Sequence, residues 1–202
     1  MVLIGNSNVG KSTIARYFLK NKKLTTGAIG KHAGSTVSLK LYDDPSVPYQ
    51  IVDLPGFGAM TRTSKDLKDK IHTEIINYIE RDKSNIFLIM VIVNGIRIMD
   101  ELEKWYYQDE TTIPLTFEFI SWIENIQLPC IMVINKIDRL KHKELDQILH
   151  EIDKILTDIH IQVKGNISKG LLKIFTVSAK KEMNMGKLQS FVEEIWNMMN
   201  TG

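Results

Sequence analysis

A short apolar segment runs straight into a glycine-containing loop at the start of the chain, and this pairing constrains the fold more than any other feature. The apolar segment is Met1–Ile4, and the loop, Gly5–Ser12, reads GNSNVGKS. Apolar residues follow at helical spacing, namely Ile14, Ala15, Phe18 and Leu19. A strand, such a loop and a helix together surround an anion with backbone N–H groups and the positive end of the helix dipole. The sequence therefore predicts a nucleotide phosphate site, the alternative being a glycine turn that matches by chance.

Within this loop, two side chains carry chemistry of their own. Lys11 is predicted to reach the β- and γ-phosphates of a nucleotide, and the Ser12 hydroxyl is predicted to bind Mg²⁺. The glycines at Gly5 and Gly10 let the backbone curl inward around the anion.

Composition sets the class of protein. A chain of 202 residues with 44% apolar content predicts a single α/β domain over residues 1–202 with a sizeable core. The only cysteine, Cys130, lies in an apolar run, which excludes a disulfide framework and favours a small buried side chain in a reducing compartment. The longest apolar run, Ile86–Val93, is too short to cross a bilayer. We expect a cytoplasmic monomer that binds neither DNA nor membranes, with a first strand that looks clipped at its N-terminus.

Six apolar segments rich in β-branched residues predict the strands of one sheet. They are Met1–Ile4, Val37–Tyr42, Tyr49–Val52, Ile86–Val93, Cys130–Ile134 and Ile174–Val177. Nearly continuous apolar strands are typical of a sheet that is buried on both faces. The sequence thus predicts an α/β fold with a six-stranded, mostly parallel, doubly wound sheet and helices on both faces, whose ligands bind beyond the carboxyl ends of the strands.

Two apolar stripes at helical spacing predict core-facing helices. One contains Leu145, Ile148, Leu149, Ile152, Ile155, Leu156 and Ile159, and the other Leu188, Phe191, Val192, Ile195, Trp196 and Met199. The segment Leu24–Ser35 reads as a loop, and Asn94–Pro114 reads as a polar and aromatic insertion. The aromatic residues Trp105, Tyr106 and Tyr107 of this insertion are predicted to pack over the edge of the core, with base stacking as the alternative.

A second motif predicts which base the site reads. Asn135-Lys136-Ile137-Asp138 follows the strand Cys130–Ile134 directly. Guanine presents an N1–H and an amine side by side, and the Asp138 carboxylate accepts from both, whereas adenine offers no such donor pair. Asn135 is expected to tie this loop to the phosphate loop, and the Lys136 stem to cover the base; an ordinary turn after a strand is the alternative.

Three further segments complete the pattern in sequence order. Asp53-Leu54-Pro55-Gly56 follows a predicted strand, so that Asp53 holds a water of the Mg²⁺ shell and the Gly56 N–H meets the γ-phosphate. Ser178-Ala179-Lys180 follows the last strand and places a backbone N–H near the guanine carbonyl. Thr36 is predicted to give Mg²⁺ a second hydroxyl, with Thr25, Thr26 and Ser35 as competing candidates.

These motifs resemble the translation-factor-related GTPases, and among them most closely the EngB group, particularly its archaeal form. The resemblance rests on Gly5–Ser12, on Asp53–Gly58 and on the insertion around Trp105 before Ile113 and Pro114, and it covers essentially the whole chain. It implies a P-loop NTPase with a Ras-like G domain that acts as a Mg²⁺-dependent GTPase switch in assembly of the large ribosomal subunit, with a ribosomal subunit or rRNA as its partner.

One position departs from small signalling GTPases, which carry a water-orienting Gln where this chain has Phe57. Phe57 cannot hydrogen-bond water, so intrinsic hydrolysis is expected to be slow, no faster than roughly 10⁻⁴ s⁻¹. In relatives that share this loop, the residue matching Asn8 helps to hold K⁺ in place of an arginine finger. Our hypothesis is that Asn8 does so here, the alternative being an Asn that suits a tight turn.

Lys11, Gly56 and Asn8 are thus the predicted catalytic residues. Ser12, Thr36 and Asp53 are predicted to hold Mg²⁺. The predicted GTP-binding residues are Gly5, Asn6, Ser7, Asn8, Val9, Gly10, Lys11, Ser12, Thr13, Gly34, Ser35, Thr36, Asp53, Gly56, Asn135, Lys136, Asp138, Ser178, Ala179 and Lys180. In the switch, GTP and Mg²⁺ are expected to order two loops, Leu24–Thr36 and Gly56–Lys70. Two rivals are a GTP-dependent binding module with incidental hydrolysis and a small-molecule kinase, which the guanine motif disfavours.

Overall fold

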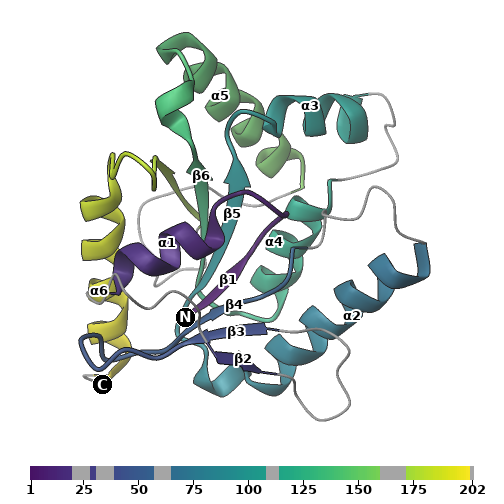
Figure 1. Cartoon of the computed structure of the whole chain (residues 1–202). Helices are drawn as coiled ribbons and strands as arrows, with labels where there is room; N and C mark the ends of the chain where they lie inside the picture. The colour runs from purple at the N-terminus through teal and green to yellow at the C-terminus, as the bar shows by residue number, and fades with distance from the viewer. Residues whose placement is uncertain (20–27, 31–38, 57–64, 108–113, 160–171, 201–202) are drawn as a thin grey trace.

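The structure is a computed structural model that describes residues 1–19, 28–30, 39–56, 65–107, 114–159 and 172–200, and its elements form one sheet with helices on both faces (Figure 1). The strands are β1 (Val2–Ile4), β2 (Ala28–Gly30), β3 (Leu39–Tyr42), β4 (Ile51–Asp53), β5 (Ile89–Asn94), β6 (Cys130–Asn135) and β7 (Lys173–Val177). The α-helices are α1 (Lys11–Phe18), α2 (Lys65–Arg81), α3 (Ile98–Leu102), α4 (Leu115–Asn125), α5 (His142–Asp158) and α6 (Met185–Asn200). The described residues also form two 3₁₀-helices, η1 (Lys83–Asn85) and η3 (Ile137–Arg139), and one π-helix, η2 (Glu103–Tyr107).

The sheet runs in the order β2-β3-β4-β1-β5-β6-β7. Strands β1, β4, β5, β6 and β7 are parallel, while β3 lies antiparallel to both β2 and β4. After β1 the chain builds one side of the sheet, and from β5 onward it builds the other. The order therefore reverses beside β1, and the loop that leaves the carboxyl end of β1 lies where this fold binds ligands.

Alternating residues of the central strands pack into two cores, one on each face of the sheet. Ile4 and Val91 belong to the core covered by α2, α3, α4 and α5, whereas Leu3 and Ile92 belong to the core covered by α1 and α6. All four side chains are fully buried. This is why the strands read as continuous apolar runs: each successive side chain points into one of two cores.

The α/β fold class is confirmed, with one strand more than predicted. The described sheet has seven strands rather than six, because Ala28–Gly30 pairs antiparallel with β3 inside the segment Leu24–Ser35 that the sequence indicated as a loop. So short a strand, containing one Ala and one Gly, has no alternating apolar pattern, and only its pairing partner defines it. The predicted strands at Tyr49 and Ile86 begin later, at Ile51 and Ile89.

Three other predictions need correction. The segment Gly56–Lys70 is not entirely loop, because α2 begins at Lys65, and the insertion Asn94–Pro114 contains α3 and η2. The predicted core residue Met199 is 54% exposed, since it lies in the last turn of α6, beyond the end of the sheet-facing stripe.

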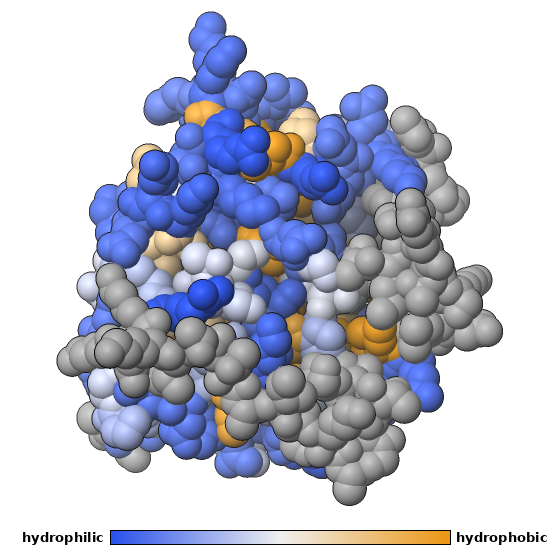
Figure 2. All heavy atoms as spheres, viewed as in Figure 1, coloured by the Kyte–Doolittle hydropathy of each residue, from blue (hydrophilic) through white to orange (hydrophobic). Residues whose placement is uncertain are grey.

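The face seen in Figure 2 is mostly hydrophilic, with hydrophobic atoms in small separate patches. Within the described ranges, no helix combines the length and the apolar character that crossing a membrane requires.

Candidate functional site

The loop between β1 and α1 is shaped by two glycines that no other residue could replace without strain. Gly5 has a φ of 145° and Gly10 a φ of 106°. A Cβ on Gly5 would lie 2.2 Å from the Ile92 carbonyl oxygen, and one on Gly10 would lie 2.3 Å from Asn135 Nδ2. The loop is therefore seated directly against β5 and against the side chain of Asn135.

Lys11 lies inside the curl of this loop and is only 8% exposed. Its Nζ donates to the carbonyl oxygens of Gly5 at 2.9 Å and Asn6 at 3.1 Å. Burial lowers the pKa of the ammonium below its ordinary value of 10.5, and the Asp53 carboxylate counteracts part of this effect. A lysine has three N–H donors, so one is left over for an anion at the mouth of the loop.

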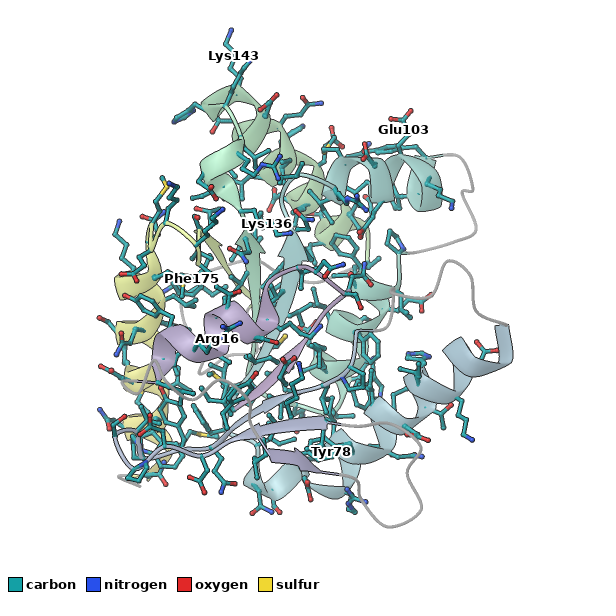
Figure 3. All side chains as sticks on the ribbon, viewed as in Figure 1. Arg16, Tyr78, Glu103, Lys136, Lys143 and Phe175 are labelled. Carbon is teal, nitrogen blue, oxygen red and sulfur yellow. The ribbon has the colours of Figure 1, made fainter. Side chains whose placement is uncertain are left out.

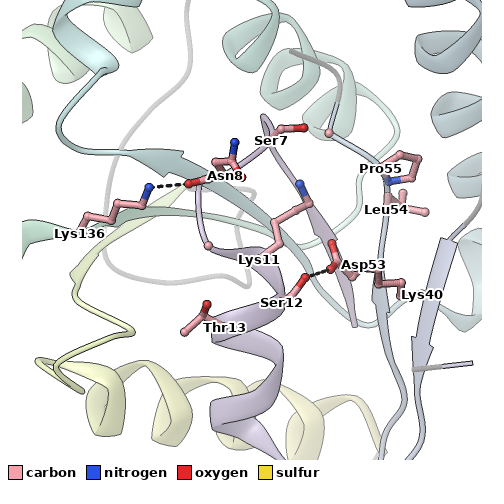
Figure 4. Close-up of a pocket in the computed structure, with 12 residues that line it drawn as sticks. Ser7, Asn8, Lys11, Ser12, Thr13, Lys40, Asp53, Leu54, Pro55 and Lys136 are labelled. Atoms are coloured by element: carbon pink, nitrogen blue, oxygen red, sulfur yellow. Dashed lines mark hydrogen bonds between the residues drawn. The ribbon is translucent and has the colours of Figure 1, made fainter. Parts of the chain in front are cut away.

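The predicted magnesium residues meet at the ends of α1 and β4 (Figure 4). Ser12 Oγ donates to Asp53 Oδ2 at 2.6 Å, and Asp53 is buried. A hydroxyl and a carboxylate at this distance form an all-oxygen donor set, which fits Mg²⁺. The third predicted residue, Thr36, and with it Gly34 and Ser35, lies outside the described residues.

Gly56 packs against the phosphate loop itself. A Cβ at this position would lie 2.5 Å from both the N and the Oγ of Ser7, and 2.9 Å from the carbonyl carbon of Asn6. Only glycine fits so close to another backbone. Gly56 therefore reaches the end of the loop at which a terminal phosphate is expected, while the next residue, Phe57, is outside the described part of the chain.

At the opposite end of the site, Asn135 joins three segments by one side chain. Its Nδ2 donates to the Val9 carbonyl at 2.8 Å, and its Oδ1 accepts from the N–H groups of Lys136 at 2.8 Å and Ala179 at 3.0 Å. Asn135 is 3% exposed. The structure thus contains the link from the base loop to the phosphate loop that the sequence predicts.

Asp138, in η3, is oriented by the serine of the last motif. Ser178 Oγ donates to Asp138 Oδ1 at 2.6 Å and accepts from the Lys181 N–H at 3.1 Å. The Ala179 N–H is engaged by Asn135, so another N–H of this turn, near the exposed Lys180, would have to meet a base carbonyl. Nothing in the sequence pattern indicated this division of roles.

The phosphate end and the base loop are bridged by Lys136. Its backbone is in the left-handed region at a φ of 72°, and its Nζ donates to the Asn8 carbonyl at 2.5 Å (Figure 4). Asn8 is also left-handed, at a φ of 62°, and its side chain is exposed.

The phosphate loop, the segment Asp53–Gly56 and the Lys136 side chain surround a cavity of about 590 Å³, which is of a size suited to a nucleotide. Its described lining consists of Ser7, Asn8, Gly10, Lys11, Ser12, Thr13, Lys40, Asp53, Leu54, Pro55, Gly56 and Lys136. Sequence reasoning missed Lys40, which enters because β3 pairs antiparallel with β4 and sets Lys40 opposite Asp53. It also missed Glu101, whose carboxylate accepts from the side chain of Asn6.

Comparison with known proteins decides between nucleotide-binding families. A family model described as "50S ribosome-binding GTPase" matches residues 1–136, and one described as "Elongation factor Tu GTP binding domain" matches residues 107–199. The "Probable GTP-binding protein EngB" of Pyrococcus horikoshii is 30% identical over 90% of this chain and 85% of its own length. The protein of the same name from Methanococcus maripaludis is 35% identical over 77% of this chain and 64% of its own length. The chain belongs to the EngB group of the 50S ribosome-binding GTPase family.

A crystal structure of a probable GTP-binding protein engB supports this assignment in three dimensions. It matches with a TM-score of 0.74 at 26% identity and covers 96% of both chains. EngB-type proteins are GTP hydrolases that use Mg²⁺, so the chain is a GTP-binding GTPase. In this family the Ser12–Asp53 pair would hold Mg²⁺, which neutralises phosphate charge when bound, and the spare Lys11 donor would bind the phosphates.

Proposed function

We propose that this GTPase is a slow, nucleotide-dependent switch in assembly of the large ribosomal subunit. The observation that supports a switch is the close packing of Gly56 against Ser7 and Asn6, at the phosphate end of the cavity. A γ-phosphate that binds the Gly56 N–H must alter this contact, and so the position of the chain that follows. The ribosomal partner, a large subunit or its rRNA, is supported by the description of the matching family model.

In this proposal the site residues divide the work as their positions suggest. Lys11 stabilises charge on the β- and γ-phosphates, Ser12 and Asp53 hold Mg²⁺ together with Thr36, and Asp138 reads guanine. The protein works as a cytoplasmic monomer with a single G domain, and hydrolysis times the release of the partner.

Co-sedimentation with purified large ribosomal subunits tests the switch. We expect the protein to pellet with the subunits in the presence of a non-hydrolysable GTP analogue and to stay in the supernatant with GDP. A switch should also hydrolyse GTP faster in single-turnover reactions when subunits are added. Equal pelleting in both nucleotide states, with no change in hydrolysis, would favour the rival binding module with incidental hydrolysis.

We further propose that Asn8 supports hydrolysis by binding K⁺. Its exposed side chain lines the cavity, while its carbonyl is bound by Lys136, so the amide oxygen is the group of Asn8 left to face a cation. A cation there would stabilise transition-state charge in place of an arginine finger, a contribution of about 10³ to 10⁵ in rate. Turnover measured in KCl and in NaCl at matched ionic strength tests this: equal rates, with and without subunits, would exclude it.

A further inference from the structure

The second residue of the phosphate loop is held from outside the loop. Asn6 Nδ2 donates to the Glu101 carboxylate and lies 3.2 Å from each of its two oxygens, so that α3 contacts the phosphate loop through this side chain. Glu101 is half-buried, and this burial raises the pKa of its carboxyl group, an effect that the hydrogen bond from Asn6 opposes. A hydrogen bond to a half-buried carboxylate is stronger than one between neutral groups, so Glu101 restrains Asn6 firmly.

The peptide group of Asn6 lies where two parts of the phosphate site meet. Its carbonyl oxygen accepts from Lys11 Nζ at 3.1 Å, and its carbonyl carbon lies 2.9 Å from the point where a Cβ of Gly56 would be. A shift of a few tenths of an ångström in the Asn6 peptide group would therefore change its contacts with both Lys11 and Gly56. The side chain that sets this peptide is the one bound by Glu101.

Glu101 is itself carried by a segment that is anchored at its other end. The helix α3 continues into η2, where the Tyr106 hydroxyl bonds to Asp158 and the Tyr107 hydroxyl to Glu151, both on α5. Lys154 of α5 lies over the Tyr107 ring at 5.3 Å from its centroid. Figure 1 shows α3 beside α5 accordingly. The segment formed by α3 and η2 thus contacts the phosphate loop at Glu101 and α5 at Tyr106 and Tyr107.

We propose that Glu101 is a positioning residue for the γ-phosphate. Through the Asn6 side-chain amide it fixes the position of the Asn6 peptide group, which lies between Lys11 and Gly56. The position of α3 and η2 thereby depends on whether GTP or GDP is bound. Loss of Glu101 weakens GTP more than GDP, because Gly56 meets only the γ-phosphate whereas the rest of the loop serves both nucleotides. The inference rests on the proposed function only for this assignment of Gly56.

Affinities of a non-hydrolysable GTP analogue and of GDP, measured by fluorescence titration of four variants, test the proposal. Glu101→Ala should weaken the GTP analogue by about tenfold, the loss of one hydrogen bond to a charged group, and GDP by less than about twofold. Glu101→Gln keeps an acceptor oxygen and should stay within about threefold of the wild type for both nucleotides. Asn6→Ala should reproduce Glu101→Ala, and the double variant should add nothing further.

Glu103→Ala is the matched control. Glu103 is an exposed acid two residues along the same segment and lies on its outer side (Figure 3), so its loss should change neither affinity. The proposal is overturned if Glu101→Ala weakens both nucleotides equally, as simple loss of structure would, or if Glu101→Gln is as poor as Glu101→Ala. Additive effects of the two alanine variants would overturn it as well. Since no ribosomal particle is needed, failure of the ribosomal role would leave this result standing.

Discussion

The phosphate end and the base end of the candidate nucleotide site obtain their binding properties in different ways. The phosphate end is built from charge: Lys11 and Asp53 are buried, and Lys40 adds a second cation to the lining. The base end is built from directed hydrogen bonds: Asn135 Nδ2 donates to the Val9 carbonyl, and Ser178 Oγ donates to one oxygen of Asp138. Charge gives affinity that depends on Mg²⁺ and pH, whereas directed bonds select one base over another. Separate residues therefore supply the strength of binding and the selectivity for the base.

The largest effect is expected where selectivity alone is changed. Asp138→Asn replaces an acceptor by a group that also donates. Guanine then leaves a desolvated polar group unpaired, whereas the 2-oxo group of xanthine accepts from the new donor, so the preference for guanine over xanthine should shift by about 10⁴-fold. Competition titrations with guanosine and xanthosine triphosphates measure it. Tripolyphosphate, which probes the phosphate end alone, should bind unchanged. Retained GTP affinity with no gain for xanthine would contradict the separation.

Asn135→Ala should break both ends at once. It removes three hydrogen bonds and leaves the Val9 carbonyl and the Ala179 N–H without their partner, so unfolding free energy should fall by about 2–3 kcal/mol and GTP affinity by about 100-fold. Chemical denaturation and nucleotide titration measure the two losses. Asn135→Asp keeps the oxygen acceptor but loses the bond to Val9, so its two losses should be intermediate. If Asn135→Ala bound tripolyphosphate as tightly as the wild type, the proposed link between the base loop and the phosphate loop would be refuted.

A smaller effect is expected from Ser12→Ala, which affects the phosphate end only. Removing the hydroxyl that faces Asp53 takes away a predicted Mg²⁺ ligand, so GTP should bind about tenfold more weakly in Mg²⁺. In EDTA the variant and the wild type should bind alike, which makes the metal-free titration the internal control. A loss of the same size in EDTA would mean that Ser12 acts without the metal.

The smallest effect concerns the pH dependence of the nucleotide-free protein. The pKa of Lys11 is lowered by burial, so between that value and the ordinary 10.5 the unfolded chain binds more protons than the folded one. The Lys11 contribution to stability is therefore unfavourable at neutral pH and is relieved as the pH rises toward 10.5. Denaturation of the wild type and of Lys11→Met over this range should show the wild type gaining relative to the variant; parallel curves would contradict the burial of a charged ammonium.

The contrast also explains what could be predicted from the sequence. Gly10, Lys11 and Asn135 are readable because each acts within a short motif whose spacing reflects local backbone geometry. Lys40 and Glu101 are not, because one depends on the register of β3 against β4 and the other on a contact between residues 95 positions apart. The short strand β2 was missed for the same reason. Periodicity predicted both cores but wrongly counted Met199 as a core residue, although this side chain, in the last turn of α6, is 54% exposed.

One side chain described above bears on how freely such a site can vary. The three atoms that bond to Asn135 all belong to the backbone of other residues, at Val9, Lys136 and Ala179. The identities of those three residues therefore play no direct part in the connection, whereas the amide at position 135 has no substitute that both donates and accepts at the same reach. The tolerance of the site to mutation is thus unequal. Three segments depend on the identity of the single residue at position 135, whereas the other residues of the junction can be replaced by any side chain that fits the available space.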